Sequence, residues 1–473
     1  MTKKLNELTI TEAQEGLKNK KFTAFELTRA CLEVAKTKNK NLNAYITICE
    51  ESAMTEAVRA DEMIAQGKQQ PLTGIPFSVK DAICTVDIRS TGSGKILDNY
   101  VAPYEATVIG KIRAQGGVLI GKTNCDAFGH GASNENSMYG PVRNPHDLSK
   151  VAGGSSGGSA ASVAAHTCLF SIGEDTGGSI RQPAAFCGIV GLRVSYGRNS
   201  RYGIMPMASS LDTVGPMTKT IEDCAIVMGE IAGPDARDAT TVPDVVPDYT
   251  KELSKKKKFT VGVPKEYFEL DGMEAETKKI IEDKISALKN AGHKIVPISL
   301  PYTKYALPVY YIVVPSEDSS NLGRLDGIRY GVRAQVDNLY DIYAKSRGVG
   351  FPEEVKRRIM VGTYALSAGY YDAYYRKAQK VRTLIIRDFE RVFETVDLLI
   401  TPSSPFPAFD LGAKKDDVIA MYLADVFMSA AAVAGLPAIS VPAGLTESGL
   451  PVGAQIIGPR LHESEVMNLA KQI

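Results

Sequence analysis

Two segments rich in serine and glycine are the part of this sequence best suited to chemistry. Gly153–Ser159 reads GGSSGGS and Asp175–Arg181 reads DTGGSIR, with 24 residues from Ser155 to Ser179. Glycine weakens strands and helices, so such runs indicate positive φ angles or backbone amides that must approach a ligand without a Cβ in the way. The serines between the glycines are candidate nucleophiles.

Three other motifs have competing interpretations. Residues 116–123 (GGVLIGKT) satisfy the phosphate-loop pattern, but that motif needs a strand before it and a helix after it, and here the predicted helix comes first. Residues 154–158 fit the G-x-S-x-G nucleophile elbow, which requires a partner histidine, and His293 and His462 are predicted on the surface. The four lysines at 255–258 are predicted to be a solvated lead-in to a strand rather than an RNA contact.

The elements that must position the serines alternate between helix and strand, which indicates an α/β fold. Apolar spacing predicts a helical start over residues 11–38, with Thr23 as an N-cap. Each serine segment falls at an element boundary. The remaining predicted elements are strands at 76–83, 118–120, 169–173, 259–263 and 398–402, helices at 107–114, 159–165 and 273–291, and helical patterns over 302–396.

The composition excludes a strongly charged protein. The 473 residues contain 55 Lys plus Arg and 54 Asp plus Glu, so no global field draws the chain to nucleic acid or an anionic membrane. Seven scattered cysteines without Cys-x-x-Cys spacing predict reduced, mostly buried thiols, and five histidines show no metal-ligand spacing. The absence of an apolar signal core and of any stretch of transmembrane length favours a cytoplasmic protein.

The serine motifs, together with Lys80 in GIPFSVKD (residues 74–81), resemble the amidase signature family of serine hydrolases. The resemblance implies a catalytic triad of Ser179 as nucleophile, Ser155 after a cis peptide bond, and Lys80. It also implies one large α/β domain over residues 1–473, with a central mixed β-sheet covered by helices on both faces. The signature core is expected at about 70–230, and a helix-rich substrate-side region at about 300–396.

Amide hydrolysis by such a triad needs a base, an acid for the leaving ammonia and donors for the oxyanion. Lys80 follows an apolar run, and burial disfavours its charged form, so it is expected to be the neutral base. Ser155 is expected to relay the proton between Lys80 and Ser179. The two glycines of the second motif predict an oxyanion site made by the amides of Thr176, Gly177, Gly178 and Ser179.

Segments outside the signature narrow the resemblance to the A subunits of tRNA-dependent amidotransferases. They are SSNL at 319–322, DGIRYG at 326–331, EVKRRI at 354–359, GYYDAYY at 369–375 and AGLPAIS at 434–440. This resemblance implies that glutamine is hydrolysed for ammonia, with Arg358 and Asp425 holding its α-carboxylate and α-ammonium and Tyr310 lining the pocket.

The same resemblance implies partners. A B subunit would bind ATP, Mg and the mischarged Glu-tRNA(Gln), a small C subunit would clasp the two, and this chain would carry no cofactor and contact no membrane. Departures from the family pattern occur at Cys125–Gly131, near the expected substrate entrance, and at Leu192–Val194. A free-standing amidase of small aliphatic or aryl amides is the alternative enzyme, and a scaffold with an unused triad is the non-enzymatic alternative.

Overall fold

A single large mixed sheet organises the chain in the computed structural model, which describes residues 3–414 and 417–473. Within these residues the sheet has 11 strands in the order β1-β3-β2-β4-β6-β5-β10-β11-β9-β7-β8. The strands are β1 (Tyr45–Ile48), β2 (Pro76–Lys80), β3 (Val118–Thr123), β4 (Phe170–Asp175), β5 (Val190–Arg193), β6 (Thr213–Thr218), β7 (Thr260–Pro264), β8 (Lys294–Ile298), β9 (Leu398–Pro402), β10 (Ala438–Leu445) and β11 (Pro451–Ile457).

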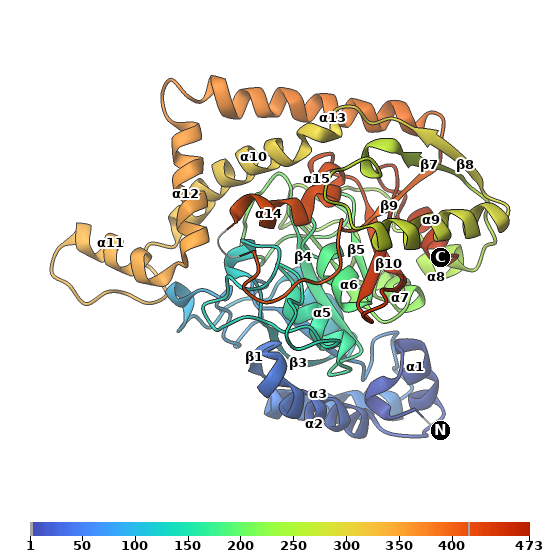
Figure 1. Ribbon diagram of the computed structural model, residues 1–473. Helices are drawn as coiled ribbons and strands as arrows, with labels where there is room; N and C mark the ends of the chain where they lie inside the picture. Colours follow the sequence, from blue (N-terminus) through green and yellow to red (C-terminus); the bar gives the residue numbers. More distant parts are fainter. Residues whose placement is uncertain (1–2, 415–416) are drawn as a thin grey trace.

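Helices pack on both faces of this sheet, as the α/β prediction required (Figure 1). They are α1 (Ile10–Lys18), α2 (Ala24–Leu42), α3 (Glu50–Ala65), α4 (Thr107–Ala114), α5 (Gly157–Ala164), α6 (Arg181–Cys187), α7 (Ile221–Ile231), α8 (Tyr249–Leu253), α9 (Ala275–Asn290), α10 (Ala306–Asn321), α11 (Leu339–Gly350), α12 (Glu353–Leu366), α13 (Lys377–Phe393), α14 (Val418–Tyr422), α15 (Val426–Val433) and α16 (Glu463–Ala470).

Local sequence signals set several element ends. Thr23 caps α2: its hydroxyl accepts a hydrogen bond from the amide of Glu26, whose carboxylate accepts one from the amide of Thr23. Gly292 follows α9 at φ +94°, a conformation that glycine adopts without a steric penalty. The capped start and the glycine stop both lie where the sequence predicted them.

Two parts of the chain lie on opposite sides of the sheet. Helices α2 and α3 lie on one side, and α10, α12 and α13 lie on the other, with α11 projecting farthest from the body (Figure 1). Apolar side chains of α10, α13 and α15 form a core of their own beside the main core under the sheet, including Val313, Ile385 and Ala430. Helices α10 and α13 of the helix-rich region predicted at 300–396 therefore pack with α15 in this second core.

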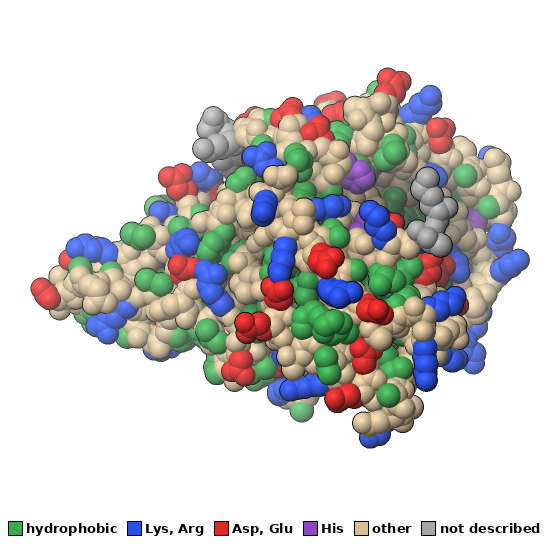
Figure 2. Space-filling view, turned by 90° about the horizontal axis from the view of Figure 1, so that it is seen from below, with side chains coloured by type: hydrophobic (Ala, Val, Ile, Leu, Met, Phe, Trp, Pro, Cys, Tyr) green, Lys and Arg blue, Asp and Glu red, His purple; other side chains and the backbone are tan. Residues whose placement is uncertain are grey.

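The structure corrects one prediction and supports others. His293, predicted on the surface, is buried because its ring stacks on Phe259 and its Nδ1 accepts a hydrogen bond from the Phe259 amide. The seven cysteines, all within the described ranges, are buried and form no disulfide. Lysine, arginine, aspartate and glutamate side chains are interspersed on the face in Figure 2, in keeping with the balanced composition. No helix in residues 3–414 or 417–473 has both the length and the hydrophobicity that a membrane crossing requires.

Candidate active site

The sheet brings the lysine and the two serine motifs to one edge. β2 and β4 are parallel neighbours, with Val79 opposite Ile172, so their carboxyl ends lie at the same edge of the sheet. Lys80 is the last residue of β2 and is completely buried. Its Nζ donates a hydrogen bond of 2.8 Å to Oγ of Ser155. The structure thus brings together two of the three predicted triad residues in direct contact.

The turn before α5 holds Ser155 in place through its backbone. The Gly154–Ser155 peptide bond is cis, as the resemblance implied. The amide of Gly154 donates to Oε1 of Gln182 at 2.9 Å, and the carbonyl of Ser155 accepts from the amide of Asp126 at 3.1 Å. A Cβ at residue 154 would lie 2.1 Å from a carboxylate oxygen of Asp126, so this position requires glycine.

Ser179 lies in the turn between β4 and α6 and is 7% exposed. Its carbonyl accepts a hydrogen bond of 3.1 Å from the amide of Ser156, which ties the two serine motifs together. No hydrogen bond between the hydroxyls of Ser155 and Ser179 occurs in the part of the chain that the structure describes. Of the contacts that the predicted triad requires, the structure forms the one between Lys80 and Ser155.

The predicted oxyanion site is a turn with unused donors. Across the described residues, the amides of Gly177, Gly178 and Ser179 donate to no protein acceptor. Gly178 has φ +155°, and a Cβ there would lie 2.6 Å from Cβ of Met428. The hydroxyl of Thr176 anchors the start of the turn by donating to Asp212 at 2.7 Å. Free amides on a braced turn are the donors that an oxyanion needs.

An ion-pair network supports this turn, and the sequence analysis did not predict it. Asp175 is buried and contacts Nε of Arg181 at 3.1 Å and Nη1 of Arg193 at 2.9 Å. Although burial opposes its ionisation, the two guanidinium groups hold the pKa of Asp175 well below its usual range. The carboxylate also accepts a hydrogen bond from the amide of Ile180 at 3.1 Å. Asp175 and Arg181 belong to the DTGGSIR motif, so their place in it was the available signal.

The predicted substrate cation is in place and already has a partner. Nε of Arg358 on α12 donates to Glu354 at 2.8 Å, and its guanidinium lies 5.0 Å from the ring centre of Tyr311 and 5.5 Å from that of Tyr422. Burial disfavours its charge, but Tyr311 and Glu354 keep the pKa of Arg358 above its usual value. The residue is therefore a fixed cation with an oriented planar head.

Tyr310 and Asp425 lie beside the glycine turn. A Cβ added to Gly177 would lie 2.5 Å from the Tyr310 ring, and one added to Gly178 would lie 3.5 Å from Oδ1 of Asp425. Burial raises the pKa of Asp425 to about 7, while the charge of Arg358 opposes this shift. No direct ion pair joins Arg358 and Asp425 within the described ranges. Two charged groups that are not joined to each other suit a ligand that carries both charges.

A cavity of about 680 Å³ lies on the Arg358 side of the site. Its walls come from α12, from the segment that carries Tyr422, and from the loop at residues 131–136, which begins at the last residue of Cys125–Gly131. The loop residues that line it are Gly131, Ala132, Ser133, Glu135 and Asn136. The segment that departs from the family pattern therefore ends at a wall of this cavity.

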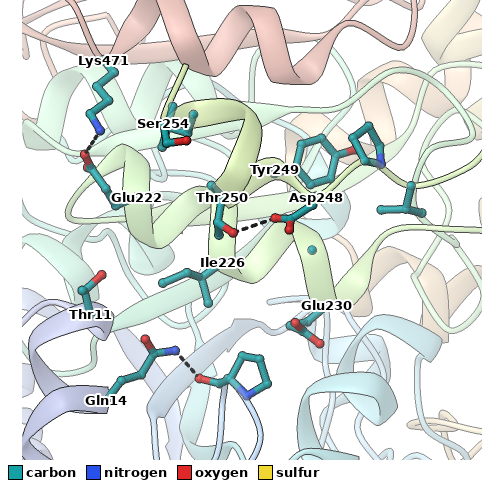
Figure 3. A pocket seen from close by; sticks show the side chains of 16 residues that line it. Thr11, Gln14, Glu222, Ile226, Glu230, Asp248, Tyr249, Thr250, Ser254 and Lys471 are labelled. Atoms are coloured by element: carbon teal, nitrogen blue, oxygen red, sulfur yellow. Dashed lines mark hydrogen bonds and ion pairs between the residues drawn. The ribbon is translucent and has the colours of Figure 1, made fainter. Parts of the chain in front are cut away.

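A second cavity, of about 780 Å³, lies away from this chemistry between α1, α7 and α8 (Figure 3). Two of its polar side chains already have partners: Glu222 pairs with Lys471 at 2.9 Å, and Gln14 donates to the carbonyl of Pro71. None of the predicted site residues lines it.

The phosphate-loop pattern at 116–123 does not form the structure that its chemistry requires. Residues 116–123 follow α4 and run into β3, so helix precedes strand. Lys122 is fully buried and donates to the carbonyl of Ile83 and to the hydroxyls of Thr85 and Ser90. A lysine held in this way is not available to phosphate, and the phosphate-loop interpretation is excluded.

Comparison with known proteins places this site in a family. The sequence model of the amidase family, described as Amidase, matches residues 26–467. The chain is 49% identical to the A subunit of the glutamyl-tRNA(Gln) amidotransferase of Koribacter versatilis, over 99% of this chain and 98% of that protein. It is 51% identical to the protein of the same name from Caldanaerobacter subterraneus subsp. tengcongensis, over 98% of this chain and 96% of that protein.

A solved structure gives the same answer for the fold. The crystal structure of the A subunit of the glutamyl-tRNA(Gln) amidotransferase of Thermotoga maritima superimposes with a TM-score of 0.81 at 38% identity, covering 100% of this chain and 95% of that one. The family match spans nearly the whole chain and contains both serine motifs, Lys80 and the cavity beside Arg358. This chain belongs to the amidase family.

Proposed function

We propose that this chain is the glutamine-hydrolysing A subunit of a glutamyl-tRNA(Gln) amidotransferase. The observation that carries the proposal is the near-complete coverage, at 49–51% identity, by proteins of that name. The contact between Lys80 and Ser155 at the edge of the glycine turn supports amide hydrolysis as the chemistry. The likeness to other amidases at lower identity supports the fold and leaves the free-standing amidase as the less favoured alternative.

Acylation begins when Oγ of Ser179 attacks the side-chain carbonyl carbon of glutamine. The proton of Ser179 passes to Ser155, whose own proton passes to the neutral amine of Lys80. The carbonyl oxygen becomes an oxyanion, which accepts hydrogen bonds from the free amides of Gly177, Gly178 and Ser179. These donors are fixed before the reaction, so stabilising the charge requires little reorganisation.

Breakdown of the tetrahedral intermediate returns the proton. The carbon–nitrogen bond breaks, and the proton on Lys80 passes through Ser155 to the leaving nitrogen, so that ammonia departs and a glutamyl ester remains on Ser179. Water then attacks this ester by the same route in reverse, and glutamate leaves. Lys80 thus serves first as base and then as acid in each half of the cycle.

The α-groups of glutamine bind at the opposite end from the scissile amide. Arg358 receives the α-carboxylate, with its orientation set by Glu354 and the tyrosine rings. Asp425 receives the α-ammonium, and its place beside Gly178 sets the distance to the nucleophile. Tyr310 fills the wall against Gly177. A simple amide lacks both charged groups and gains nothing from these residues.

The ammonia serves a partner. A B subunit would bind ATP, Mg and Glu-tRNA(Gln) and carry out the amidation that makes Gln-tRNA(Gln), and a C subunit would hold the complex together. The near-zero net charge of this chain and the buried state of Lys122 support placing the nucleotide and the tRNA on a partner chain.

The test is ammonia release from glutamine by the chain co-expressed with the candidate B and C subunits. A panel of simple aliphatic and aryl amides serves as the comparison, and S179A serves as the matched variant. The proposal predicts that glutamine is preferred and that release disappears in S179A. Turnover of simple amides without turnover of glutamine would instead identify a free-standing amidase, and no turnover with an intact fold would point to a scaffold.

A further inference from the structure

A buried carboxyl group that the mechanism above does not use lies next to the proposed base. Glu174 is in β4, five residues before Ser179, and is 2% exposed. Its Oε2 lies 3.5 Å from Nζ of Lys80, which is itself fully buried. Its other oxygen, Oε1, is buried and has no hydrogen-bond partner in the described part of the chain. A carboxyl group and an amine are therefore enclosed together one hydrogen bond from Ser155.

The backbone holds Glu174 rigidly at this place. Its carbonyl accepts a hydrogen bond of 3.1 Å from the hydroxyl of Ser156, the residue after Ser155. β4 also pairs with β6 on its other side, with Glu174 opposite Val214. The carboxyl group cannot reach bulk water from here, so its charge is balanced by its neighbours alone.

The charged neighbours of the pair are few. Lys80 on β2 favours the ionised form of Glu174, as does Arg201, whereas Asp212 opposes it. Burial outweighs these effects and raises the pKa of Glu174 above its usual value. Around Lys80 itself, Cys125 and Asp126 lie within the range of its charge, and Asp81 follows it in the chain. Glu174 is the one carboxyl group among the described residues that lies within 4 Å of Nζ of Lys80.

We propose that Glu174 is a positioning residue that acts through Lys80, holding the amine against Ser155 and, when ionised, stabilising its ammonium form. The proposal rests on the proposed function, because it concerns the base of that reaction. The carboxylate of Glu174 lies 3.5 Å from Nζ of Lys80, so its negative charge favours the ammonium form of the amine electrostatically. Lys80 has to lose that proton before it can accept one from Ser155.

The same pairing assists the second half of the step. When Lys80 accepts the proton, the new ammonium lies beside a carboxylate in a dry site, where a lone cation would be costly. Glu174 thus stabilises the ammonium form of Lys80, and the same effect moves the onset of activity to higher pH. The pH at which ammonia release reaches half of its maximum measures this effect directly.

The test is the pH profile of kcat/KM for glutamine, measured on the complex with its B and C partners for wild type, E174Q and E463Q. The glutamine side chain introduced at position 174 keeps the shape of glutamate and removes its charge. The rising limb of the kcat/KM profile of E174Q is therefore expected at a pH lower by about one unit or more. Glu463 is a fully buried carboxyl group paired with Arg198 away from the site, so E463Q controls for the loss of a buried acid. Its limb is expected to stay at the wild-type pH.

Three outcomes would overturn the proposal: an unchanged limb in E174Q, a limb moved to higher pH, or a folded E174Q complex that is inactive at every pH. If E174Q does not fold, E174T supplies a second neutral side chain, suited to a strand, with the same expected shift. The pH dependence of Ser179 acylation by a serine-directed probe requires no glutamine. If the wild-type complex releases no ammonia from glutamine, the proposed function fails, while the probe still tests the pairing of Glu174 with Lys80.

Discussion

Replacing Asp175 by asparagine should damage stability and catalysis together. The carboxylate contacts two buried guanidinium groups and accepts the amide of Ile180, and neither arginine reaches water. Asparagine offers one acceptor oxygen and no charge, so D175N leaves Arg181 and Arg193 with a surplus of buried positive charge. Breaking a buried ion pair in this way costs about 3–5 kcal/mol.

This cost translates into a measurable change. With an unfolding entropy of roughly 2.1 cal/mol/K per residue, a chain of this length loses about 1 °C of melting temperature per kcal/mol, so D175N should melt about 3–5 °C lower. Because the folded-state pKa of Asp175 is depressed, its contribution is fully present above the unfolded pKa of about 3.9 and is lost only as the pH falls toward the folded value. The difference from wild type should therefore be constant between pH 6 and pH 8.

The assay compares thermal melting and ammonia release for wild type, D175N and D223N. Asp223 is a buried aspartate that accepts the amide of Ile10 and, among the described residues, pairs with no arginine. D223N should therefore lose less stability and keep normal kcat. D175N should also lower kcat, because the turn that presents the oxyanion amides rests on this network. A D175N protein as stable as D223N, or with full activity, would refute the assignment of the network as the brace of the turn.

Three further predictions concern the site itself. G178A should lower kcat by about 10²–10³ with little change in the KM for glutamine, because a Cβ would lie 2.6 Å from Met428 and displace an oxyanion amide; an unaltered kcat would argue against that role. R358K should raise the KM for glutamine at least tenfold and change kcat less, since lysine cannot reproduce the planar contact with Glu354 and a carboxylate; equal kinetics in R358K would count against the carboxylate site. Burial raises the pKa of Asp425 to about 7, so the carboxylate takes up a proton as the pH falls through 7, and the KM for glutamine should rise below this pH. D425N should show a high KM that does not change over the same pH range. A pH-dependent KM in D425N would contradict the assignment.

The positions of the serine and glycine motifs were predicted from the sequence better than the contacts around them. The motif glycines and serines lie at element boundaries as predicted, because glycine disfavours helices and strands through its own backbone, whatever the rest of the fold. The apolar run at 76–83 predicted a strand that carries Lys80, and β2 ends earlier than predicted, at Lys80 itself. The contacts of Glu174 and Arg193 could not be predicted, because they depend on which strands become neighbours in the sheet.

The substrate side illustrates the same limit. Arg358 was identified by resemblance, but its pairing with Glu354 on the same helix follows from i,i+4 spacing and could have been anticipated. The packing of Tyr310 against Gly177 joins residues more than a hundred positions apart and needed the fold. His293 was misplaced for a similar reason: its helix exit is polar in sequence, but Phe259 and Gln472 enclose the ring.

The central claim, that Ser179 is the nucleophile toward glutamine, is tested most directly by trapping the acyl-enzyme. The complex is quenched with acid during turnover of glutamine, digested and analysed by mass spectrometry, with S179A treated in parallel. The account predicts a glutamyl adduct on the peptide that contains Ser179 and no adduct in S179A. An adduct on Ser155 or on a cysteine, or ammonia release that continues in S179A, would contradict it.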